Sequence, residues 1–127
     1  MVRATAFEAA PLIKPPALPG VSDLEAKVYF EKVPLLPNLE CYIEQGCATG
    51  GGKRNWESYG YKVEVQDEFE RIVLSDPQTN GGLLVAVAPD EVASFEALVR
   101  EIGFGDSMNL IGQLGERTTK QRHVSVA

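Results

Sequence analysis

The sequence predicts an α+β domain, in which helices pack against a mixed, mainly antiparallel sheet. Apolar residues alternate with other residues over 24–30, which is typical of a half-buried strand. Apolar residues recur at helical spacing over 92–102, and two further strands are predicted at 109–114 and 123–126. Strands and helices are interspersed without strict alternation, and this order favours the α+β class.

Helix start and stop signals support the two best-defined helices. Asp90 is placed to cap the helix over 92–102, and Gly103 is placed to end it. A second helix is predicted over 36–43, with Gly46 as its C-terminal stop.

The middle of the chain is less regular. Residues 56–59 are compatible with one helical turn, 61–65 with a short strand and the acidic 67–70 with a helix. The continuous apolar run at 83–87 predicts a central, buried strand.

The composition limits the organisation of the chain and its partners. A length of 127 residues with 44% apolar residues predicts one folded domain, assigned to 21–127, preceded by a Pro-rich arm at 1–20. The net charge of −6 argues against nucleic acid and against anionic membrane surfaces as partners. No apolar run approaches the about 18 residues needed to span a bilayer, and no signal peptide is visible, so we expect a cytoplasmic protein.

The metal-ligating and nucleophilic residue types are sparse. Cys41 and Cys47, with His123, match no zinc pattern, and we expect the cysteines to be buried as small apolar residues. No catalytic constellation can be identified around the single histidine. The sequence therefore predicts no metal site and no catalytic residue in this chain.

A first candidate binding segment is GGGKRN at 50–55. Adjacent glycines let successive backbone N–H groups converge, and basic side chains add positive charge, so the segment is suited to hold a phosphate or carboxylate. The candidate ligands are Gly50, Gly51, Gly52, Arg54 and Asn55. The alternative is a mobile loop with solvated cations, because short glycine-basic strings are common.

A second candidate is the cluster of turn-forming residues at 76–82. Its candidate residues are Asp76, Gln78, Thr79, Gly81 and Gly82. The functional interpretation is a rigid loop that faces a ligand or another domain, with Asp76 capping a turn. The alternative is a tight connection into the strand at 83, and turn statistics favour this alternative.

These segments resemble those of selenophosphate synthetase (selenide, water dikinase). The string SDPQTNGGLLVAV at 75–87 is similar to that family's D-P-Q-T-S-G-G-L-L motif, and GGGKRN followed by SYG resembles its G-G-x-x-R-N…S-Y-G loop. VPLLP at 33–37 and IGQL at 111–114 match in the same order. Asn80 replaces the usual Ser, and Gly52-Lys53 replace the commoner Thr plus a polar residue.

The resemblance covers about 21–126 and implies only the family's C-terminal domain, an α+β fold shared with aminoimidazole ribonucleotide synthetase and partly ferredoxin-like. The family makes selenophosphate from selenide, ATP and water with Mg²⁺, and its catalytic, ATP and metal residues lie in an N-terminal part. No counterpart of that part is recognised here. We therefore expect no cofactor for this chain alone.

Three functional hypotheses remain open. The chain is a non-catalytic domain that binds an anion or an ATP-binding domain in trans, or it is half of a split selenide, water dikinase. The third hypothesis is a structural homo-oligomer without the chemistry. A homodimer in which the apolar, Pro-rich residues 7–20 cross between subunits is expected, because a domain without its partner exposes apolar surface.

Overall fold

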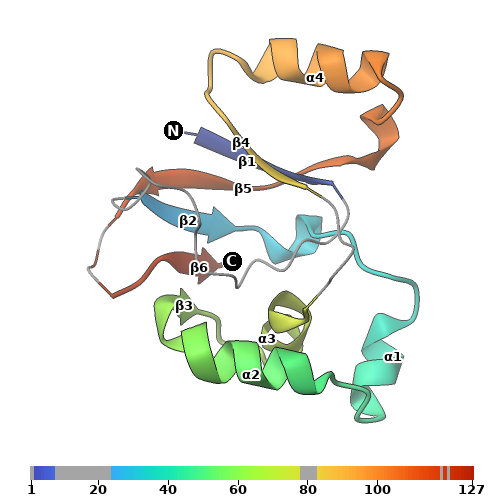
Figure 1. The fold of residues 1–127 in the computed structure, drawn as a ribbon, viewed down its shortest axis with the longest axis vertical. Helices are drawn as coiled ribbons and strands as arrows, with labels where there is room; N and C mark the ends of the chain where they lie inside the picture. Colours follow the sequence, from blue (N-terminus) through green and yellow to red (C-terminus); the bar gives the residue numbers. More distant parts are fainter. Residues whose placement is uncertain (1, 8–23, 78–82, 118, 120) are drawn as a thin grey trace.

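In the part of the chain that the structure describes, four α-helices combine with one sheet, and the α+β prediction is confirmed (Figure 1). The structure is a computed structural model, which describes residues 2–7, 24–77, 83–117, 119 and 121–127. In chain order the elements are β1 (Val2–Phe7), β2 (Leu24–Val28), η1 (Phe30–Lys32), α1 (Leu39–Glu44), α2 (Gly50–Tyr59), η2 (Gly60–Lys62), β3 (Val63–Glu64), α3 (Glu68–Ser75), β4 (Leu84–Val87), α4 (Val92–Glu101), η3 (Gly105–Ser107), β5 (Met108–Glu116) and β6 (Val124–Val126).

The sheet is mixed and has the strand order β3-β6-β2-β5-β1-β4. β5 pairs antiparallel with β2 and with β1, and β1 pairs antiparallel with β4. β6 pairs parallel with β2 and with β3. Three of these five pairings are antiparallel, which agrees with the expected mixed, mainly antiparallel sheet.

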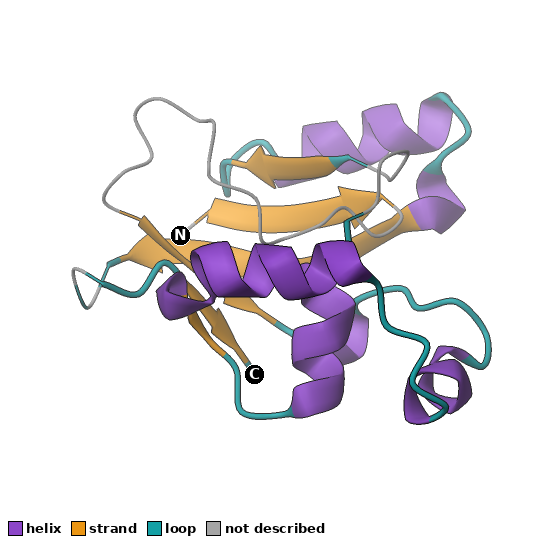
Figure 2. Cartoon of the chain, turned by 60° about the horizontal axis from the view of Figure 1, so that its bottom comes forward, coloured by secondary structure: helices purple, strands orange, loops and turns teal. Residues whose placement is uncertain are grey.

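The core lies between the sheet and the helices α2 and α3, which are side by side (Figure 2). Its buried members are Val28, Val33, Leu74 and Ile111, and the partly buried Phe30, Trp56, Tyr59, Val63, Val124 and Val126 pack against them. Helix α4 lies at the opposite end of the molecule, beyond β1 and β4 (Figure 1). No helix in the described part of the chain is both long and apolar enough to cross a membrane.

The helices and strands with the clearest apolar periodicity in the sequence were predicted correctly. Strands β2, β5 and β6 and helices α1 and α4 lie where the pattern predicted them, within a few residues. Gly46 and Gly103 follow the two helices with φ of 83° and 87°, which is the left-handed conformation that glycine adopts at low cost. The cap of α4 was predicted wrongly, because Glu91 rather than Asp90 is its N-cap residue and makes no side-chain capping bond.

Two strands differ from the prediction. The first residues were assigned to an arm outside the domain, but Val2–Phe7 form β1 between β5 and β4. Their sequence, VRATAF, contains the β-favouring Val, Thr and Phe. Residues 8–20 of the predicted arm lie outside the described residues.

The strand predicted to be central is a strand at the end of the sheet. β4 pairs with β1 alone among the described strands, and Leu83, just before it, is 71% exposed. A continuous apolar run is typical of a strand that is buried on both faces, but it does not specify the position of the strand in the sheet.

The close approach of β2 and β5 requires a glycine at position 112. Gly112 pairs with Val28, and a Cβ at Gly112 would collide with the carbonyl oxygen of Lys27. A Cβ at Gly115, in the same strand, would meet nothing within 4 Å.

We expect Gly112→Ala to lower the free energy of unfolding by about 1–3 kcal/mol, because a backbone oxygen cannot move away without disturbing the strand pairing. Gly115→Ala is the matched control, with an expected change within about 0.5 kcal/mol. Urea denaturation of both variants measures this, and equal midpoints for the two would contradict the close approach.

Candidate functional site

The two segments singled out in the sequence meet at the beginning of α2. Thr49 is the N-cap residue, and its Oγ1 accepts a hydrogen bond of 3.0 Å from the backbone N–H of Gly52. The same hydroxyl donates a hydrogen bond of 2.7 Å to Oδ1 of Asp76. One side chain therefore caps α2 and joins it to the residue that follows α3. Asp76 accepts this bond from Thr49. The turn that Asp76 was expected to cap includes residues 78–82, which lie outside the described residues.

The three glycines form the first turn of α2, so the expectation of a loop at 50–52 was wrong. Glycine is a poor helix former, and close packing accounts for its presence. A Cβ at Gly51 would collide with the ring of Pro77, and a Cβ at Gly52 would lie 3.5 Å from Oγ of Ser75. The glycines thus allow the first turn of α2 to contact the end of α3.

One further hydrogen bond joins the two segments, and a second one, inside α3, fixes the side chain of Ser75. Nδ2 of Asn55 donates to the carbonyl oxygen of Ser75 at 2.9 Å. The hydroxyl of Ser75, which is 3% exposed, donates to the carbonyl oxygen of Arg71 at 2.7 Å. Asn55 and Asp76 thus hold the start of α2 against the end of α3.

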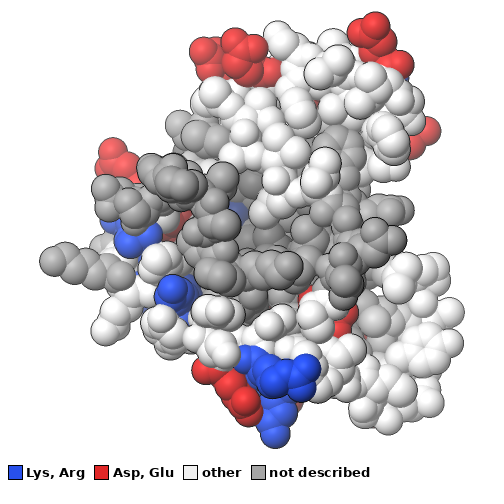
Figure 3. Space-filling view, viewed as in Figure 1, with Lys and Arg blue, Asp and Glu red and all other residues white. Residues whose placement is uncertain are grey.

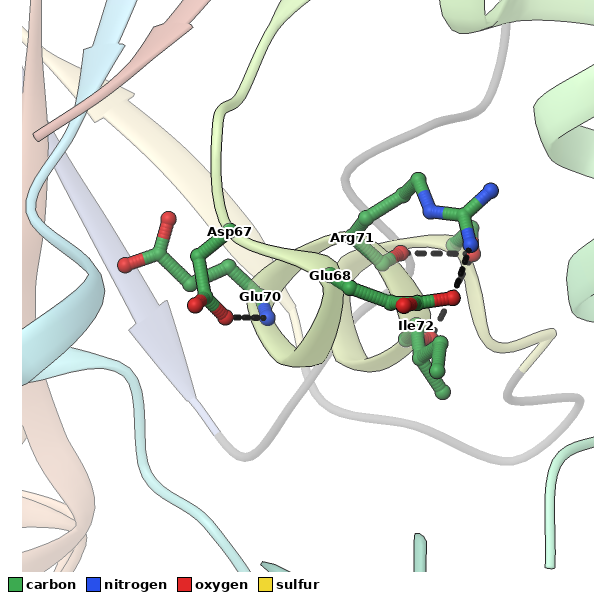
Figure 4. Close-up of polar contacts among 6 residues, drawn as sticks. Asp67, Glu68, Glu70, Arg71 and Ile72 are labelled. Atoms are coloured by element: carbon green, nitrogen blue, oxygen red, sulfur yellow. Dashed lines mark hydrogen bonds and ion pairs between the residues drawn. The ribbon is translucent and has the colours of Figure 1, made fainter. Parts of the chain in front are cut away.

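The start of α3 is defined by charged side chains (Figure 4). Oδ1 of Asp67 accepts from the backbone N–H of Glu70 at 3.1 Å, and Arg71 forms an ion pair of 2.8 Å with Glu68. Burial, with a contribution from the nearby Asp67, raises the pKa of Glu70 above its ordinary value. These contacts are local to the first turns of α3, and the residue that follows its other end, Asp76, meets Thr49.

The first turn of α2 carries the positive character of the site. In an α-helix the first N–H groups have no intrahelical partner, so Gly50 and Gly51 present theirs at the helix start. Nη1 of Arg54 lies 3.6 Å from the position that a Cβ on Gly50 would take, so the guanidinium lies close to this turn. Lys53 and Arg54 are exposed, and Figure 3 shows basic side chains over α2. Chemically, the arrangement is suited to an oxyanion.

The other residues considered in the sequence are those of the turn after Pro77, the two cysteines and the residue types that can bind a metal ion. Gln78, Thr79, Gly81 and Gly82 lie outside the described residues. Cys41 and Cys47 are exposed, so the expectation that they are buried was wrong. Among the described residues no group of three or more His, Cys, Asp or Glu side chains is arranged to hold a metal ion.

Thr49 is the residue of this site that the sequence analysis missed. A threonine just before a run of helical residues is a recognised N-cap signal. It was obscured because the three following glycines indicated a loop. No local signal shows that its hydroxyl reaches Asp76, which is 27 positions away.

The role of Thr49 can be tested by removing its hydroxyl. We expect Thr49→Val to lower the free energy of unfolding by about 0.5–2 kcal/mol, because the N-cap bond is lost and Asp76 loses a donor. Thr49→Ser retains a hydroxyl at the same position and serves as the control. Thermal or urea unfolding measures both; a loss in Thr49→Val no larger than that in Thr49→Ser would contradict the role of the hydroxyl.

The contact between α2 and Pro77 has its own matched pair of variants. Gly51→Ala should destabilise the protein by about 1–3 kcal/mol, since the new methyl group collides with the proline ring. Gly50→Ala meets only Arg54 at 3.6 Å and should be neutral or slightly stabilising, because alanine favours a helix. If both variants unfold at the same denaturant concentration, the packing of Gly51 against Pro77 is refuted.

Comparison with known proteins relates most of the chain to one family. It is 42% identical over 103 residues to a selenide, water dikinase of Sulfurovum sp., which covers 81% of this chain and 29% of that protein. It is 47% identical over 96 residues to a selenide, water dikinase of Pseudomonas aeruginosa, covering 76% of this chain and 27% of the relative. A selenide, water dikinase of Photobacterium profundum is 52% identical over 69 residues, covering 54% of this chain and 20% of the relative. No family model matches the chain.

The resemblance stated from the motifs is thereby confirmed. The chain spans less than a third of the length of the curated relatives that it matches. By sequence it is related to the selenide, water dikinases, and it corresponds to their C-terminal region.

Proposed function

We propose that this chain is a binding domain of the selenophosphate synthetase type, which takes an oxyanion at the start of α2 and associates with an ATP-binding domain in trans. Alone it does not catalyse the reaction of ATP, selenide and water. The observation that carries the proposal is the hydrogen bond between Thr49 and Asp76, because it brings the two family-like segments to one place.

The local chemistry supports an oxyanion as the ligand. The N–H groups of Gly50 and Gly51 and the guanidinium of Arg54 are donors at the positive end of a ten-residue helix. Arg54 is preferred over Lys53 as the main side-chain donor, because a planar guanidinium can hold two oxygens at once. A phosphate group, free or carried by a nucleotide, has this chemistry.

Exposed apolar side chains support the partner domain. Leu98, Ile102 and Phe104 are each more than half exposed in and after α4, and Leu36 and Tyr42 are exposed around α1. Large exposed apolar groups favour association. The relatives named selenide, water dikinase are more than three times longer than the part matched here, and the partner corresponds to their remaining part.

Ligand binding is tested by titrating ATP, ADP and inorganic phosphate, each with and without Mg²⁺, while calorimetry and amide NMR shifts are followed. We expect shifts concentrated at 50–55, and Arg54→Gln should weaken binding about tenfold, the loss of one charge-assisted contact. The control is Arg100→Gln, which removes an arginine paired with Glu96 on α4. Shifts scattered over the surface with none at 50–55 would refute the anion site.

Catalysis is tested separately with the same protein. The chain alone should release no AMP from ATP and selenide above background, because phosphoryl transfer needs metal ions and positioned charges around the triphosphate. Mg²⁺-dependent AMP release that disappears in Asp76→Ala would overturn the non-catalytic assignment and favour half of a split enzyme with intrinsic activity.

A further inference from the structure

A second group of basic side chains lies where β5 ends and β6 begins. Arg117 follows β5, and His123 precedes β6. Nη2 of Arg117 lies 3.3 Å from Nδ1 of His123. The backbone fixes His123 on both sides, since its N–H donates to the carbonyl of Lys62 at 2.8 Å and its carbonyl accepts from Ala26 at 2.9 Å. Strand pairing thus brings the side chains of Arg117 and His123 together and places the backbone of Lys62 beside His123. Nζ of Lys62 lies 5.5 Å from the centroid of the neighbouring Tyr61 ring.

Arg117 is incompletely satisfied in this position. Its Nε is buried and has no hydrogen-bond partner. A buried donor without a partner is costly, and native structures usually supply such a donor with a protein group, a water or an ion. Among the described residues no carboxylate forms an ion pair with Arg117, so its charge is not neutralised there by a neighbour.

Two of the acidic side chains on the adjoining strands are engaged. Glu64 of β3 forms an ion pair of 2.6 Å with Arg122. Glu25 of β2, next to Ala26, also interacts with another group of the protein and is not free. The charges that act on His123 are those of Arg117 and Lys62. The other charged groups on the adjoining segments are Arg122 next to it, Glu25 and Glu64 on β2 and β3, and the exposed Glu116 at the end of β5.

The protonation of His123 follows from its partner. A guanidinium only donates hydrogen bonds, so Nδ1 must accept and the imidazole is neutral with its proton on Nε2. Burial, followed by the charges of Arg117 and Lys62, lowers the pKa of His123 below its ordinary value. A negative ion bound among these groups would oppose the charges of Arg117 and Lys62, and it would therefore raise the pKa of His123.

We propose that Arg117, His123 and Lys62 form a second oxyanion site, distinct from the start of α2, which accepts a tetrahedral dianion of the sulfate or phosphate class. On binding, His123 takes a proton from solvent at Nδ1 and releases the guanidinium of Arg117 to the anion. The anion then receives donors from all three side chains, and the binding of anion and proton is mutually favourable.

The single histidine of the chain makes the proposal directly measurable. The imidazole of His123 is titrated by NMR between pH 5 and 8 in sodium sulfate and in sodium chloride of equal ionic strength. Sulfate is the probe because it remains a dianion over this range. We expect sulfate to raise the pKa of His123 by about half a unit or more relative to chloride, as a nearby opposite charge does. The sulfate affinity should also be several-fold higher at pH 5.5 than at pH 8.

Variants separate a built site from general screening. Arg117→Gln and, independently, Lys62→Gln should reduce the sulfate effect on His123, whereas Arg100→Gln on α4 should leave it unchanged. His123→Gln should bind sulfate with an affinity that no longer depends on pH. Equal pKa values in sulfate and chloride, or a sulfate effect that survives in both Arg117→Gln and Lys62→Gln, would overturn the proposal.

Inorganic phosphate and methyl phosphate then identify the source of the anion. Stronger binding of inorganic phosphate supports a free anion, and equal or stronger binding of the ester supports a phosphoryl group carried by a larger molecule. The readout is the pKa of His123 and not the amide shifts at 50–55. A failure here therefore leaves the site at the start of α2 untouched, and the reverse also holds.

Discussion

The hydroxyl of Thr49 connects the two parts of the chain that carry family-like motifs. It acts once as acceptor, for the N–H of Gly52, and once as donor, to Asp76. A hydroxyl can fill both roles at the same time, whereas an ionised carboxylate only accepts and an ammonium only donates. Two glycines of α2 fit this junction, because a Cβ at Gly51 would collide with Pro77 and one at Gly52 would lie 3.2 Å from the Thr49 hydroxyl. Asn55 adds a separate bond to the carbonyl oxygen of Ser75.

Local signals were sufficient for about half of the fold. β2 and α4 were predictable because their apolar periodicity extends over several residues, and Gly46 and Gly103 mark the ends of α1 and α4. The start of α2 could not be predicted in this way. Intrinsic propensity disfavours three consecutive glycines in a helix, and the contact that outweighs it comes from Pro77, which is distant in sequence.

Strand order depends on pairing between distant segments, which single-sequence patterns do not contain. β1 lies between β5 and β4 although it begins at the second residue of the chain. The site was predictable as two segments from glycine and turn chemistry and from family resemblance. Their junction was not predictable, because it rests on one hydroxyl contact across 27 positions. The cluster of Arg117, His123 and Lys62 was likewise invisible, since β3 and β6 must pair in parallel before Lys62 reaches His123.

Helix α4 shows how the apolar surface relates to a partner. Val99 is 3% exposed, but Leu98 and Ile102, which were predicted to share its apolar face, are 53% and 58% exposed. A helix of a globular domain normally buries a stripe at least about 100° wide, so the sheet covers only part of this stripe. The apolar run at Leu83 and Leu84 is exposed in the same way at the end of the sheet. Among the described residues nothing covers these side chains, and the partner domain proposed above would supply such a cover.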